Sequence, residues 1–398
     1  MRDDLPELTA AERAAYLDRI GLGTADPVGE PGLDLLTRLQ LAHLLTVPFE
    51  NLDIHLGRGI SLEPGRVLAK VVGERRGGYC YELNSAFARL LRSLGFDVTL
   101  VSVRIPYDRG GLSPEFDHLA MLVAAAAGGE RHLVDVGFGD AFTVPLPLRS
   151  GAEVADRDHR VRLTDHGDHW DYEEDRGGGW RLWYRFTTTP QDLGAFEGMN
   201  RFQESSPESH FTGTRICTRL TPTGRLTLSD RRLIETVVGG DRSERSLAEA
   251  DVSPLLADEF GVVVPAAPSL VDLIGQLPAD PAITLATNGP SGRPRLTLVG
   301  GRVDGDVLRI RIDDAAPAVD DLRRDGRCTV LLAGPDPSSP PVEVRGWAAL
   351  DDAAGADATD APDHAADAVD AVDAGGATAG GRRVIVRPQE VVIADDAV

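Results

Sequence analysis

The 398-residue sequence is poor in cysteine, in basic residues and in long apolar runs. Its three cysteines, Cys80, Cys217 and Cys328, lie far apart, which argues against a disulfide framework and against a cysteine metal site. Only 41 residues are basic against 63 acidic ones, so the net charge is −22. A surface that acidic repels phosphate backbones, and we therefore expect no nucleic-acid partner. Lysine occurs once, as Lys70, and we attribute its scarcity to codon usage.

No stretch is long enough to cross a bilayer, because the longest apolar candidate is only residues 120–127. Residues 1–6 contain no apolar run that would serve as a signal peptide. We therefore expect a cytoplasmic protein that does not contact membranes. A hydrophobic content of 42% and a charged content of 26% are typical of a globular chain, and the length predicts two or three domains.

The hydrophobic pattern predicts a first region over residues 1–262. Leucines at helical spacing, and a capping box in which Thr9 precedes Glu12 by three residues, predict helices in the opening part. Short apolar or β-branched runs then predict strands at 98–105, 119–124, 133–136, 160–163, 180–187 and 215–228. Residues 231–260 turn partly helical again, and the proline-punctuated residues 263–268 predict a linker.

Residues 269–398 form a second predicted unit. Five strand candidates follow one another between positions 282 and 350, separated by Asn-Gly, Ser-Gly and Asp-Gly turns and by one short helix at 316–325. This spacing predicts a small, mostly antiparallel barrel or sandwich. Residues 351–380 hold 12 Ala and 8 Asp, with too few large apolar groups to offset the entropy of ordering. We interpret them as a disordered acidic loop between two strands.

The most informative stretch is residues 75–84, Arg-Arg-Gly-Gly-Tyr-Cys-Tyr-Glu-Leu-Asn. Its adjacent glycines, Gly77 and Gly78, are interpreted as positive-φ positions of a tight turn. Apolar residues at helical spacing follow and Gly95 is a natural stop, so Cys80 is expected at or within one residue of a helix N-terminus. There the helix dipole lowers a thiol pKa and favours the reactive thiolate. A buried structural cysteine is the alternative.

A thiol nucleophile needs a base and a group that orients the base, and His118 and Asp135 are the candidates. They belong to consecutive predicted strands, and the short Ala/Gly-rich turn between these strands predicts a hairpin. Side chains alternate along strands, so paired residue numbers that add up to 253, 255 or 257 would place both side chains on one face. An even sum would place them on opposite faces. A buried Asp135 needs a hydrogen-bond partner, and an imidazole N–H is a suitable one.

Three further histidines, His159, His166 and His169, lie in a region rich in Asp and Arg. We interpret them as solvated loop residues rather than metal ligands, because no apolar framework fixes them, and we predict no metal site. Cys217 has strand-like apolar neighbours and is interpreted as a core residue.

Five motifs, in this order, make residues 1–262 resemble the arylamine N-acetyltransferase family. They are Val47-Pro48-Phe49-Glu50-Asn51-Leu52, Arg76-Gly77-Gly78-Tyr79-Cys80, the strand that begins at His118, Leu133-Val134-Asp135-Val136-Gly137-Phe138-Gly139, and Ser209-His210-Phe211-Thr212. The resemblance implies an α+β fold. Its parts would be an N-terminal helical bundle (about 1–95), a central β-barrel (about 96–190) and an α/β lid (about 191–262).

The resemblance also implies a catalytic triad of Cys80, His118 and Asp135, with acetyl-CoA as the acyl donor. The acetyl group would pass to the Cys80 sulfur and then to an arylamine or arylhydrazine, in a two-step ping-pong reaction. His118 would act as acid and base, and Asp135 would fix its tautomer.

Residues for both substrates follow from the same resemblance. The side chains that match the family's acceptor pocket are apolar and suit an aryl ring: Phe49, Ile105 and Phe138. Ordinary core packing is the alternative for these three. The stretch that matches positions near the CoA contributes Ser209, Phe211 and Thr212.

Residues 269–398 resemble the pyridoxamine 5′-phosphate oxidase-like split barrels that bind flavin. The matching stretches are Ala282-Ile283-Thr284-Leu285-Ala286-Thr287, Gly292-Arg293-Pro294 and Asp321-Leu322-Arg323-Arg324-Asp325. Members commonly hold the flavin phosphate with a basic residue early in the short helix, whereas here position 318 is Ala and no base precedes Arg323. Replacement ligands, or else solvated side chains, are Arg295, Arg302, Arg309 and Arg311. We therefore expect weak flavin binding or none.

Three other functions stay open at this point. An amide synthase would use the same triad with a larger acyl thioester from secondary metabolism, and only donor and acceptor specificity would distinguish it. A cysteine hydrolase of the transglutaminase or protease type would pass the acyl group to water instead of an amine. A flavin-dependent oxidoreductase would rely on the second unit beside a vestigial transferase, which the presence of all three triad residues disfavours.

Overall fold

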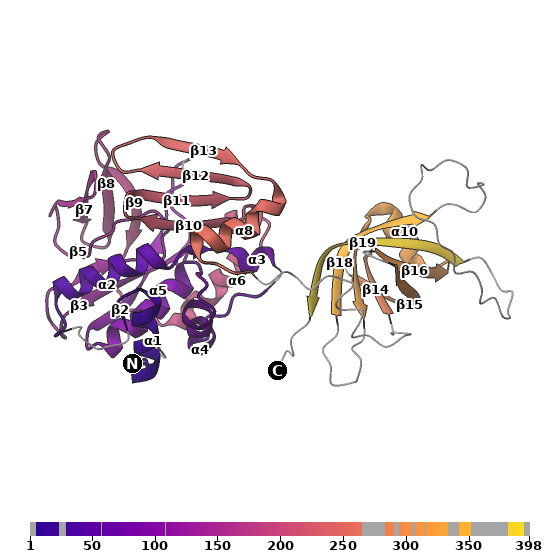
Figure 1. Cartoon of the computed structure of the whole chain (residues 1–398), viewed down its shortest axis with the longest axis horizontal. Helices are drawn as coiled ribbons and strands as arrows, with labels where there is room; N and C mark the ends of the chain where they lie inside the picture. Colours follow the sequence, from indigo (N-terminus) through magenta and orange to yellow (C-terminus); the bar gives the residue numbers. More distant parts are fainter. Residues whose placement is uncertain are drawn as a thin grey trace. The chain divides into compact units, whose positions relative to one another are not determined.

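The computed structural model divides the chain into two units, Met1–Val264 and Pro265–Val398 (Figure 1). It describes residues 5–23, 29–56, 58–107, 109–264, 283–289, 294–304, 307–313, 315–332, 342–351 and 381–393. The predicted linker, residues 263–268, lies largely outside these ranges. Each unit contains its own cluster of buried apolar side chains, as a folding domain requires.

Helices open the first unit (Figure 1, indigo to purple). They are α1 (Ala10–Arg19), α2 (Leu33–Thr46), α3 (Leu52–His55), α4 (Pro64–Leu68), the π-helix η1 (Ala69–Gly73) and α5 (Cys80–Ser93). The predicted capping box is present at α1, where Thr9 Oγ1 accepts the Glu12 N–H and the Glu12 carboxylate accepts the Thr9 N–H at 2.7 Å. α5 stops as predicted, since Gly95 has a φ of 92° directly after the helix.

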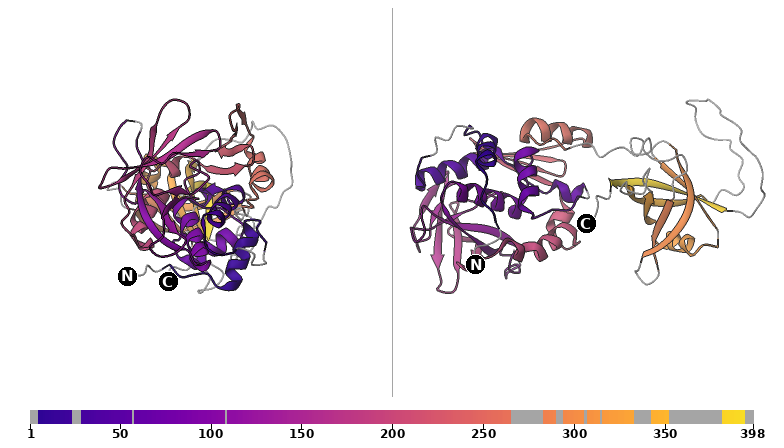
Figure 2. Two further views of the ribbon diagram at one scale, coloured as in Figure 1. Left: turned by 90° about the vertical axis from the view of Figure 1, so that its left-hand side faces the viewer. Right: turned by 90° about the horizontal axis from the view of Figure 1, so that it is seen from below.

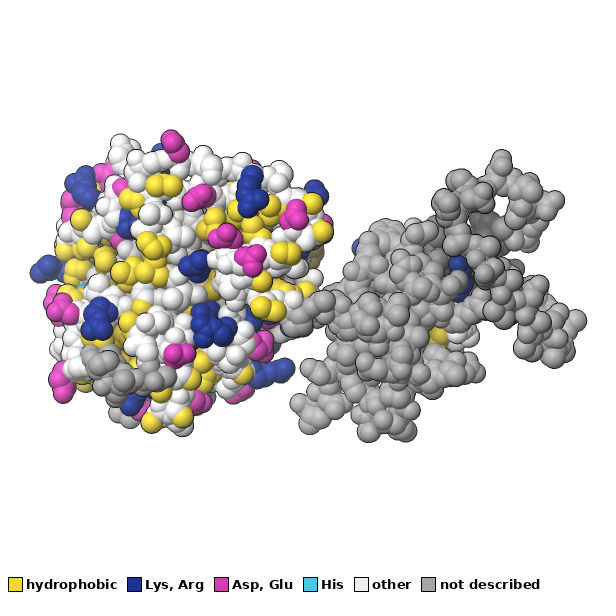
Figure 3. All heavy atoms as spheres, viewed as in Figure 1, with side chains coloured by type: hydrophobic (Ala, Val, Ile, Leu, Met, Phe, Trp, Pro, Cys, Tyr) yellow, Lys and Arg dark blue, Asp and Glu magenta, His cyan; other side chains and the backbone are white. Residues whose placement is uncertain are grey.

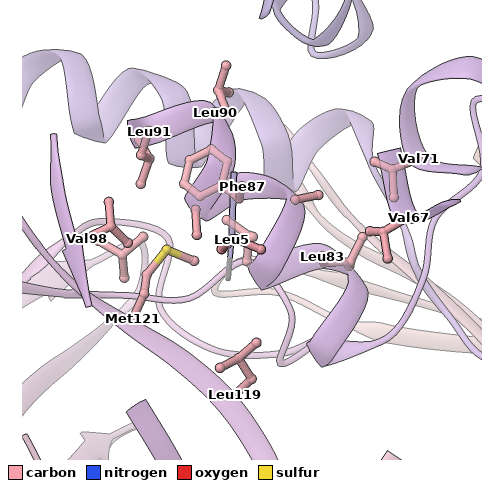
Figure 4. Packing of buried hydrophobic residues seen from close by; sticks show 14 of the residues in the cluster. Leu5, Val67, Val71, Leu83, Phe87, Leu90, Leu91, Val98, Leu119 and Met121 are labelled. Carbon is pink, nitrogen blue, oxygen red and sulfur yellow. The ribbon is translucent and has the colours of Figure 1, made fainter. Parts of the chain in front are cut away.

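α5 is buried along most of its length and forms the centre of the first core. It packs on β2 (Asp97–Arg104) and β3 (His118–Ala124). Figure 4 shows Phe87 and Leu91 of α5 gathered with Val98 and Met121 from these strands. Removing a buried ring such as Phe87 typically costs about 3–5 kcal/mol. This packing holds α5, and therefore its first residue, in a fixed position.

The central layer of the first unit is an antiparallel sheet of eight strands, in the order β5-β4-β3-β2-β9-β8-β7-β6. Its other members are β4 (His132–Val134), β5 (Leu146–Pro147), β6 (Val154–Asp156), β7 (His159–Asp165), β8 (Trp170–Asp175) and β9 (Arg181–Phe186). β5 also contacts β7, so the sheet curves strongly (Figure 2). The end strands β5 and β6 are not paired with each other in the described residues, so the predicted central barrel is a barrel-like sheet and not a closed one.

A smaller sheet, in the order β1-β10-β11-β12-β13, forms the third layer of the first unit (Figure 1). Its strands and the nearby helices are β1 (Phe49–Glu50), η2 (Leu193–Phe196), α6 (Glu197–Ser205), α7 (His210–Gly213), β10 (Ile216–Thr221), β11 (Gly224–Ser229), β12 (Arg232–Val237), β13 (Arg242–Ser246) and α8 (Glu249–Phe260). The stretch 215–228, predicted as one strand, is the hairpin β10–β11. The prediction of a partly helical stretch over 231–260 is confirmed at α8, but β12 and β13 precede that helix, because β12 pairs with β11 and β13 pairs with β12.

The second unit is a closed barrel in the order β14-β15-β16-β19-β18-β17, in which neighbouring strands are antiparallel. Its elements are β14 (Ile283–Asn288), β15 (Pro294–Asp304), β16 (Val307–Asp313), α10 (Pro317–Arg324), β17 (Arg327–Leu332), β18 (Val342–Asp351) and β19 (Gly381–Ile393). Pairing between β14 and β17, with Ile283 opposite Leu332, closes the ring of strands within the described residues. Asp351 ends β18, and residues 352–380, the rest of the predicted acidic loop, lie outside the described residues.

Within the described residues, no helix combines the length and the apolar character needed to cross a bilayer. Figure 3 shows acidic, basic and apolar side chains interspersed over one face of the first unit, with no broad patch of either charge on that face. The acidic excess of the sequence is therefore not concentrated there.

Candidate active site

Cys80 is the first residue of α5, at the helix N-terminus that the spacing predicts. The residue is buried, with 4% of its surface exposed. Tyr79 precedes the helix as its N-cap, and Glu82 Oε2 accepts the Tyr79 N–H at 3.1 Å. The first turn of a helix presents unpaired N–H groups and the positive end of the dipole, which attract negatively charged groups.

The two glycines before α5 are needed for close packing, and not for the positive φ that the sequence suggests. Neither lies in the positive-φ region, and a Cβ on Gly77 would fall 2.0 Å from the Pro48 carbonyl oxygen. A Cβ on Gly78 would fall 2.7 Å from a Glu82 carboxylate oxygen. Gly78 also forms a parallel bridge with Phe49. The loop that leads into α5 therefore runs directly beside β1.

His118 and Asp135 meet across the hairpin of β3 and β4. Met121 pairs with Val134, and these numbers add up to 255, one of the sums that place both side chains on the same face. Nε2 of His118 lies 2.6 Å from Oδ2 of Asp135. The predicted contact is therefore confirmed, although Asp135 directly follows β4 and is not part of the strand.

The surroundings of His118 stabilise its protonated form. Burial lowers the pKa of this imidazole, but the Asp135 carboxylate and the Cys80 thiol outweigh it and raise the pKa to about 10. Because Asp135 occupies Nε2, Nδ1 is the nitrogen that remains for Cys80. The three side chains are thus of the types that a nucleophile, a base and a carboxylate orienting the base require.

Three further groups hold the Asp135 carboxylate, and the sequence pattern identified none of them. Oδ1 accepts from Nδ2 of Asn84 and from the Gly137 N–H, each at 2.9 Å, and Oδ2 accepts from the Tyr184 hydroxyl at 3.4 Å. Asn84 lies one helical turn after Cys80, so both occupy one face of α5. The signal in the sequence was a polar residue four positions after Cys80.

Gly137 allows α5 to approach the segment that carries the carboxylate. A Cβ at this position would fall 2.7 Å from Nδ2 of Asn84 and 2.8 Å from Cα of Cys80. The Val136 N–H donates to Oδ1 of Asn84 at 2.9 Å, which gives a second link between the two elements. The glycine is therefore required by the close approach of Cys80 and Asn84 to the segment that carries Asp135.

Two of the residues expected in an acceptor pocket have defined aromatic contacts. The Phe138 ring lies edge to face with the His118 ring, with centroids 5.1 Å apart. Phe49 is buried in the first core and contacts the Phe211 ring, with centroids 6.0 Å apart, so core packing accounts for part of its role. Ile105 is half-buried just after β2, and its place in the pocket stays a prediction.

The three residues expected near the CoA lie at α7. Nδ2 of Asn51 donates to the Phe211 carbonyl at 2.9 Å, so the segment after β1 holds this stretch in place. The Ser209 and Thr212 hydroxyls donate to nearby main-chain carbonyls at 2.9 and 2.7 Å. Both hydroxyls therefore stabilise the local turn, and a contact with CoA stays a prediction.

Known proteins match the part of the chain that contains these residues. The N-acetyltransferase family model matches residues 32–269. An arylamine N-acetyltransferase of Mycolicibacterium smegmatis is 34% identical over 257 residues, which cover 64% of this chain and 92% of that protein. The chain belongs to the arylamine N-acetyltransferase family. As a member of that family, it is an acyltransferase.

Further arylamine N-acetyltransferases match a similar share of this chain. The enzyme of Escherichia coli K12 is 32% identical over 252 residues, covering 63% of this chain and 88% of its own length. The structure of the Mycobacterium marinum enzyme in complex with CoA has a TM-score of 0.57 at 32% identity and covers 62% of this chain and 92% of its own. The Salmonella typhimurium structure has a TM-score of 0.60 at 29% identity, covering 67% and 97%.

Five charged side chains of this N-acetyltransferase are buried together beside the start of α5: Glu50, Asp53, Lys70, Arg76 and Glu82. Nζ of Lys70 lies 2.7 Å from carboxylate oxygens of both Asp53 and Glu82. Arg76 lies 2.8 Å from Glu50 and 2.9 Å from Asp53. This charge cluster connects β1 and α3 to the first turn of α5. Lys70, whose rarity we attributed to codon usage, therefore has a structural role.

The charge cluster contains three acids and two bases, and Glu82 is the acid whose pKa is raised. Burial raises the pKa of Glu82 to about 7, although Lys70 opposes the shift. Burial acts on Asp53 as well, but Lys70 and Arg76 outweigh it and hold the pKa of that carboxyl below its ordinary value. Burial disfavours both cations too, yet the surrounding carboxylates raise their pKa values, so both stay charged at neutral pH.

Replacing Lys70 by Met should lower the free energy of unfolding by about 3–5 kcal/mol, because Asp53 and Glu82 would lose the cation that compensates their buried charge. Chemical denaturation measures the change. Arg201→Met is the matched control, since Arg201 forms an exposed ion pair with Glu197 at 3.8 Å, and stability should hardly change. Equal losses in the two variants would contradict the role of the charge cluster.

The other histidines and cysteine of the first unit lie outside the triad. Cys217 is fully buried in β10, and burial raises the pKa of its thiol well above the ordinary value, as a core cysteine requires. His159 is not a solvated loop residue as predicted, because it opens β7 and its side chain is 8% exposed. His166 and His169 lie in the turn between β7 and β8, where the His166 N–H donates to the His169 carbonyl at 2.9 Å.

Proposed function

We propose that the chain transfers the acetyl group of acetyl-CoA to an arylamine or arylhydrazine through a thioester on Cys80. The observation that carries this proposal is the 2.6 Å contact of His118 with Asp135, beside the helix that Cys80 begins. The names of the relatives support an arylamine acceptor. The CoA complex of the Mycobacterium marinum enzyme supports the donor class.

In the first half-reaction, the Cys80 thiolate attacks the carbonyl carbon of the acetyl-CoA thioester. The bond between that carbon and the CoA sulfur breaks, and the departing sulfur takes a proton from the His118 imidazolium. CoA leaves as a free thiol, the acetyl group remains on the Cys80 sulfur, and the imidazole is neutral.

In the second half-reaction, the acceptor nitrogen attacks the acetyl-thioester carbon on Cys80. Neutral His118 takes the proton that the nitrogen releases, the carbon–sulfur bond breaks, and the amide leaves. The thiolate and imidazolium are thereby restored. Acid–base participation of this kind contributes roughly 10²- to 10⁴-fold in rate.

Two neighbours of His118 set the conditions for both steps. Asp135 holds Nε2 and stabilises the imidazolium, which leaves Nδ1 as the nitrogen that can exchange a proton at the reacting sulfur. The Phe138 ring presents an apolar surface next to the imidazole, where an aryl group can pack while its nitrogen approaches the thioester.

Product analysis with acetyl-CoA and an arylamine tests the proposed function. The expected result is one N-acetylated amine for each CoA released. Acetate in place of the amide would indicate a cysteine hydrolase. Amide formation only with larger acyl thioesters would indicate an amide synthase.

For the second unit, we propose that the barrel does not hold a stoichiometric flavin. Its likeness to the pyridoxamine 5′-phosphate oxidase-like split barrels stays a prediction. Ala318, in the first turn of α10, is completely buried and offers no charge to a phosphate. Asp321 lies 3.2 Å from Arg295 and 2.8 Å from Arg324, so these two arginines are already paired with a buried carboxylate.

The purified chain should therefore be colourless or carry less than one flavin per molecule. One lost charge-assisted phosphate contact costs about 1.5–3 kcal/mol, or roughly tenfold to more than a hundredfold in affinity. The absorption spectrum after desalting measures the flavin content. A chain ending at Val264 should still accept an acetyl group on Cys80. Stoichiometric flavin, or a folded truncated chain that cannot be acetylated, would overturn this view of the second unit.

A further inference from the structure

We propose that His166, His169 and Asp171 form a binding site for a divalent transition-metal ion of the zinc class. The three residues lie at the turn between β7 and β8, outside the triad. One ligand atom from each side chain, an imidazole nitrogen or a carboxylate oxygen, lies within 4.8 Å of the other two. Imidazole and carboxylate groups are the ligands that zinc takes in proteins.

Both imidazole nitrogens lie near the Asp171 carboxylate, at distances close to those between ligands of a tetrahedral ion. Nε2 of His166 lies 3.3 Å from Oδ2 of Asp171, and Nε2 of His169 lies 3.7 Å from Oδ1. Ligands about 2.0–2.1 Å from a tetrahedral zinc ion are roughly 3.3–3.4 Å from one another. The two imidazole rings are stacked nearly parallel, at 15° with centroids 4.8 Å apart, so the exposed His166 ring has to turn for both in-plane lone pairs to meet at one ion. Three protein ligands would leave the fourth position to water.

His169 provides a second, independent observation. Its Nε2 is buried and has no hydrogen-bond partner among the described residues. Its Nδ1 lies 2.6 Å from Oδ1 of Asp168. A metal-bound histidine usually donates its other ring N–H to a carboxylate, which fixes the tautomer and directs the lone pair at the ion. Binding an ion would therefore satisfy a nitrogen that otherwise remains unpaired.

Asp171 can take part while it stays paired with Arg185. Nε and Nη2 of Arg185 lie 2.7 and 2.9 Å from the two oxygens of this carboxylate. An ionised carboxylate has about four lone-pair sites, so the arginine leaves one on each oxygen. The arginine charge weakens the attraction for a cation, but its paired contacts hold the carboxylate in a fixed orientation.

The local backbone brings the two histidines together. Gly167 has a φ of 91°, and its N–H donates to Oδ1 of Asp165 at 2.8 Å, which shapes a tight turn. An ion held across this turn would connect it to β8. Because the site is separate from the triad, we expect bound metal to raise the thermal stability of the folded chain by mass action.

Calorimetric titration of the whole chain with Zn²⁺, and separately with Ni²⁺, tests the proposal. The titrations use a Cys80→Ala background, so that the active-site thiol cannot bind the ion. The expected result is one ion per chain, with affinity reduced roughly tenfold or more by His166→Ala and by His169→Ala. Asp168→Asn keeps all three ligands and should weaken binding roughly 10- to 100-fold. His210→Ala removes an exposed histidine of α7 and is the control, with unchanged binding.

Thermal melting keeps the test decisive if a variant folds poorly. Added Zn²⁺ should raise the melting temperature of the Cys80→Ala parent and of the His210→Ala control, and should not raise that of the two ligand variants. Absence of binding to the parent, or an equal rise in all variants, would overturn the metal site. Neither result would bear on acetyl transfer, because the readouts do not depend on activity.

Discussion

Replacing Cys80 by Ala is expected to lower kcat/KM for acetyl transfer by roughly 10⁴-fold or more, because the reaction loses its nucleophile. The fold should remain, since alanine suits a helical position and the change removes a single sulfur atom. Steady-state kinetics with acetyl-CoA and an arylamine measure the loss, and circular dichroism verifies the fold.

The other two cysteines provide matched controls. Burial raises the pKa of Cys328 to about 11 and that of Cys217 well above its ordinary value, so neither supplies a thiolate at neutral pH. Cys328→Ala should therefore retain full activity. One equivalent of iodoacetamide should alkylate Cys80 alone and abolish turnover. Labelling of Cys217 or Cys328 before Cys80 would contradict the assignment of the nucleophile.

Replacing Asp135 by Asn should lower kcat by roughly 10³- to 10⁴-fold and leave KM much less affected. Each carboxylate oxygen accepts from donors, including Asn84 and the Gly137 N–H on one side and His118 on the other. An amide NH₂ would therefore face a donor in either orientation, and the imidazole would lose the acceptor that fixes its tautomer. Steady-state kinetics over a range of acceptor concentrations separate kcat from KM.

The Asp135→Asn variant should also change the pH dependence. In the native chain the pKa of His118, about 10, keeps the imidazolium through the neutral range, so the basic limb of kcat/KM should lie near pH 10. Without the carboxylate this limb should move toward neutral pH. Glu115→Gln is the control, because this exposed carboxylate accepts from the Ser102 hydroxyl at 2.8 Å and forms an ion pair with Arg104 at 3.8 Å, and the limb should stay.

The free energy of unfolding should also depend on the titration of His118. The pKa of His118 is raised on folding from its ordinary 6.5, so the folded state holds a proton that the unfolded state releases. The stabilisation is complete below about pH 6.5 and is lost as the pH rises through about 10. Denaturation at several pH values should show this loss in the native chain and not in Asp135→Asn. Identical pH profiles for the two would contradict the role of the carboxylate.

The arrangement of Cys80, His118 and Asp135 could be predicted because it depends on helix periodicity and on the alternation of side chains along strands. Apolar spacing after the glycine loop placed Cys80 at a helix N-terminus, and strand alternation limited the hairpin registers that bring His118 and Asp135 together. The structure has one of those registers, with a sum of 255. The turn spacing of the second unit likewise predicted an antiparallel barrel.

The supporting residues could not be predicted, because their partners are set by tertiary packing. Lys70 is the only lysine of the chain, but the sequence does not reveal its partners, because the approach of α3 and α5 to η1 supplies the two carboxylates. Gly77 follows a turn-like pattern, yet its real constraint is the carbonyl of Pro48. Residues 232–237 and 242–246 lacked a clear strand pattern, and they are ordered as β12 by pairing with β11 and as β13 by pairing with β12.

The most direct test of the Cys80 thioester is the intact mass of the chain after mixing with acetyl-CoA and no acceptor. The native chain should gain one acetyl group, and Cys80→Ala should gain none. Adding an arylamine should remove the acetyl group and yield an equal amount of amide. A Cys80→Ala chain that becomes acetylated and passes the group to the amine would contradict the mechanism, as would a native chain that forms amide without becoming acetylated.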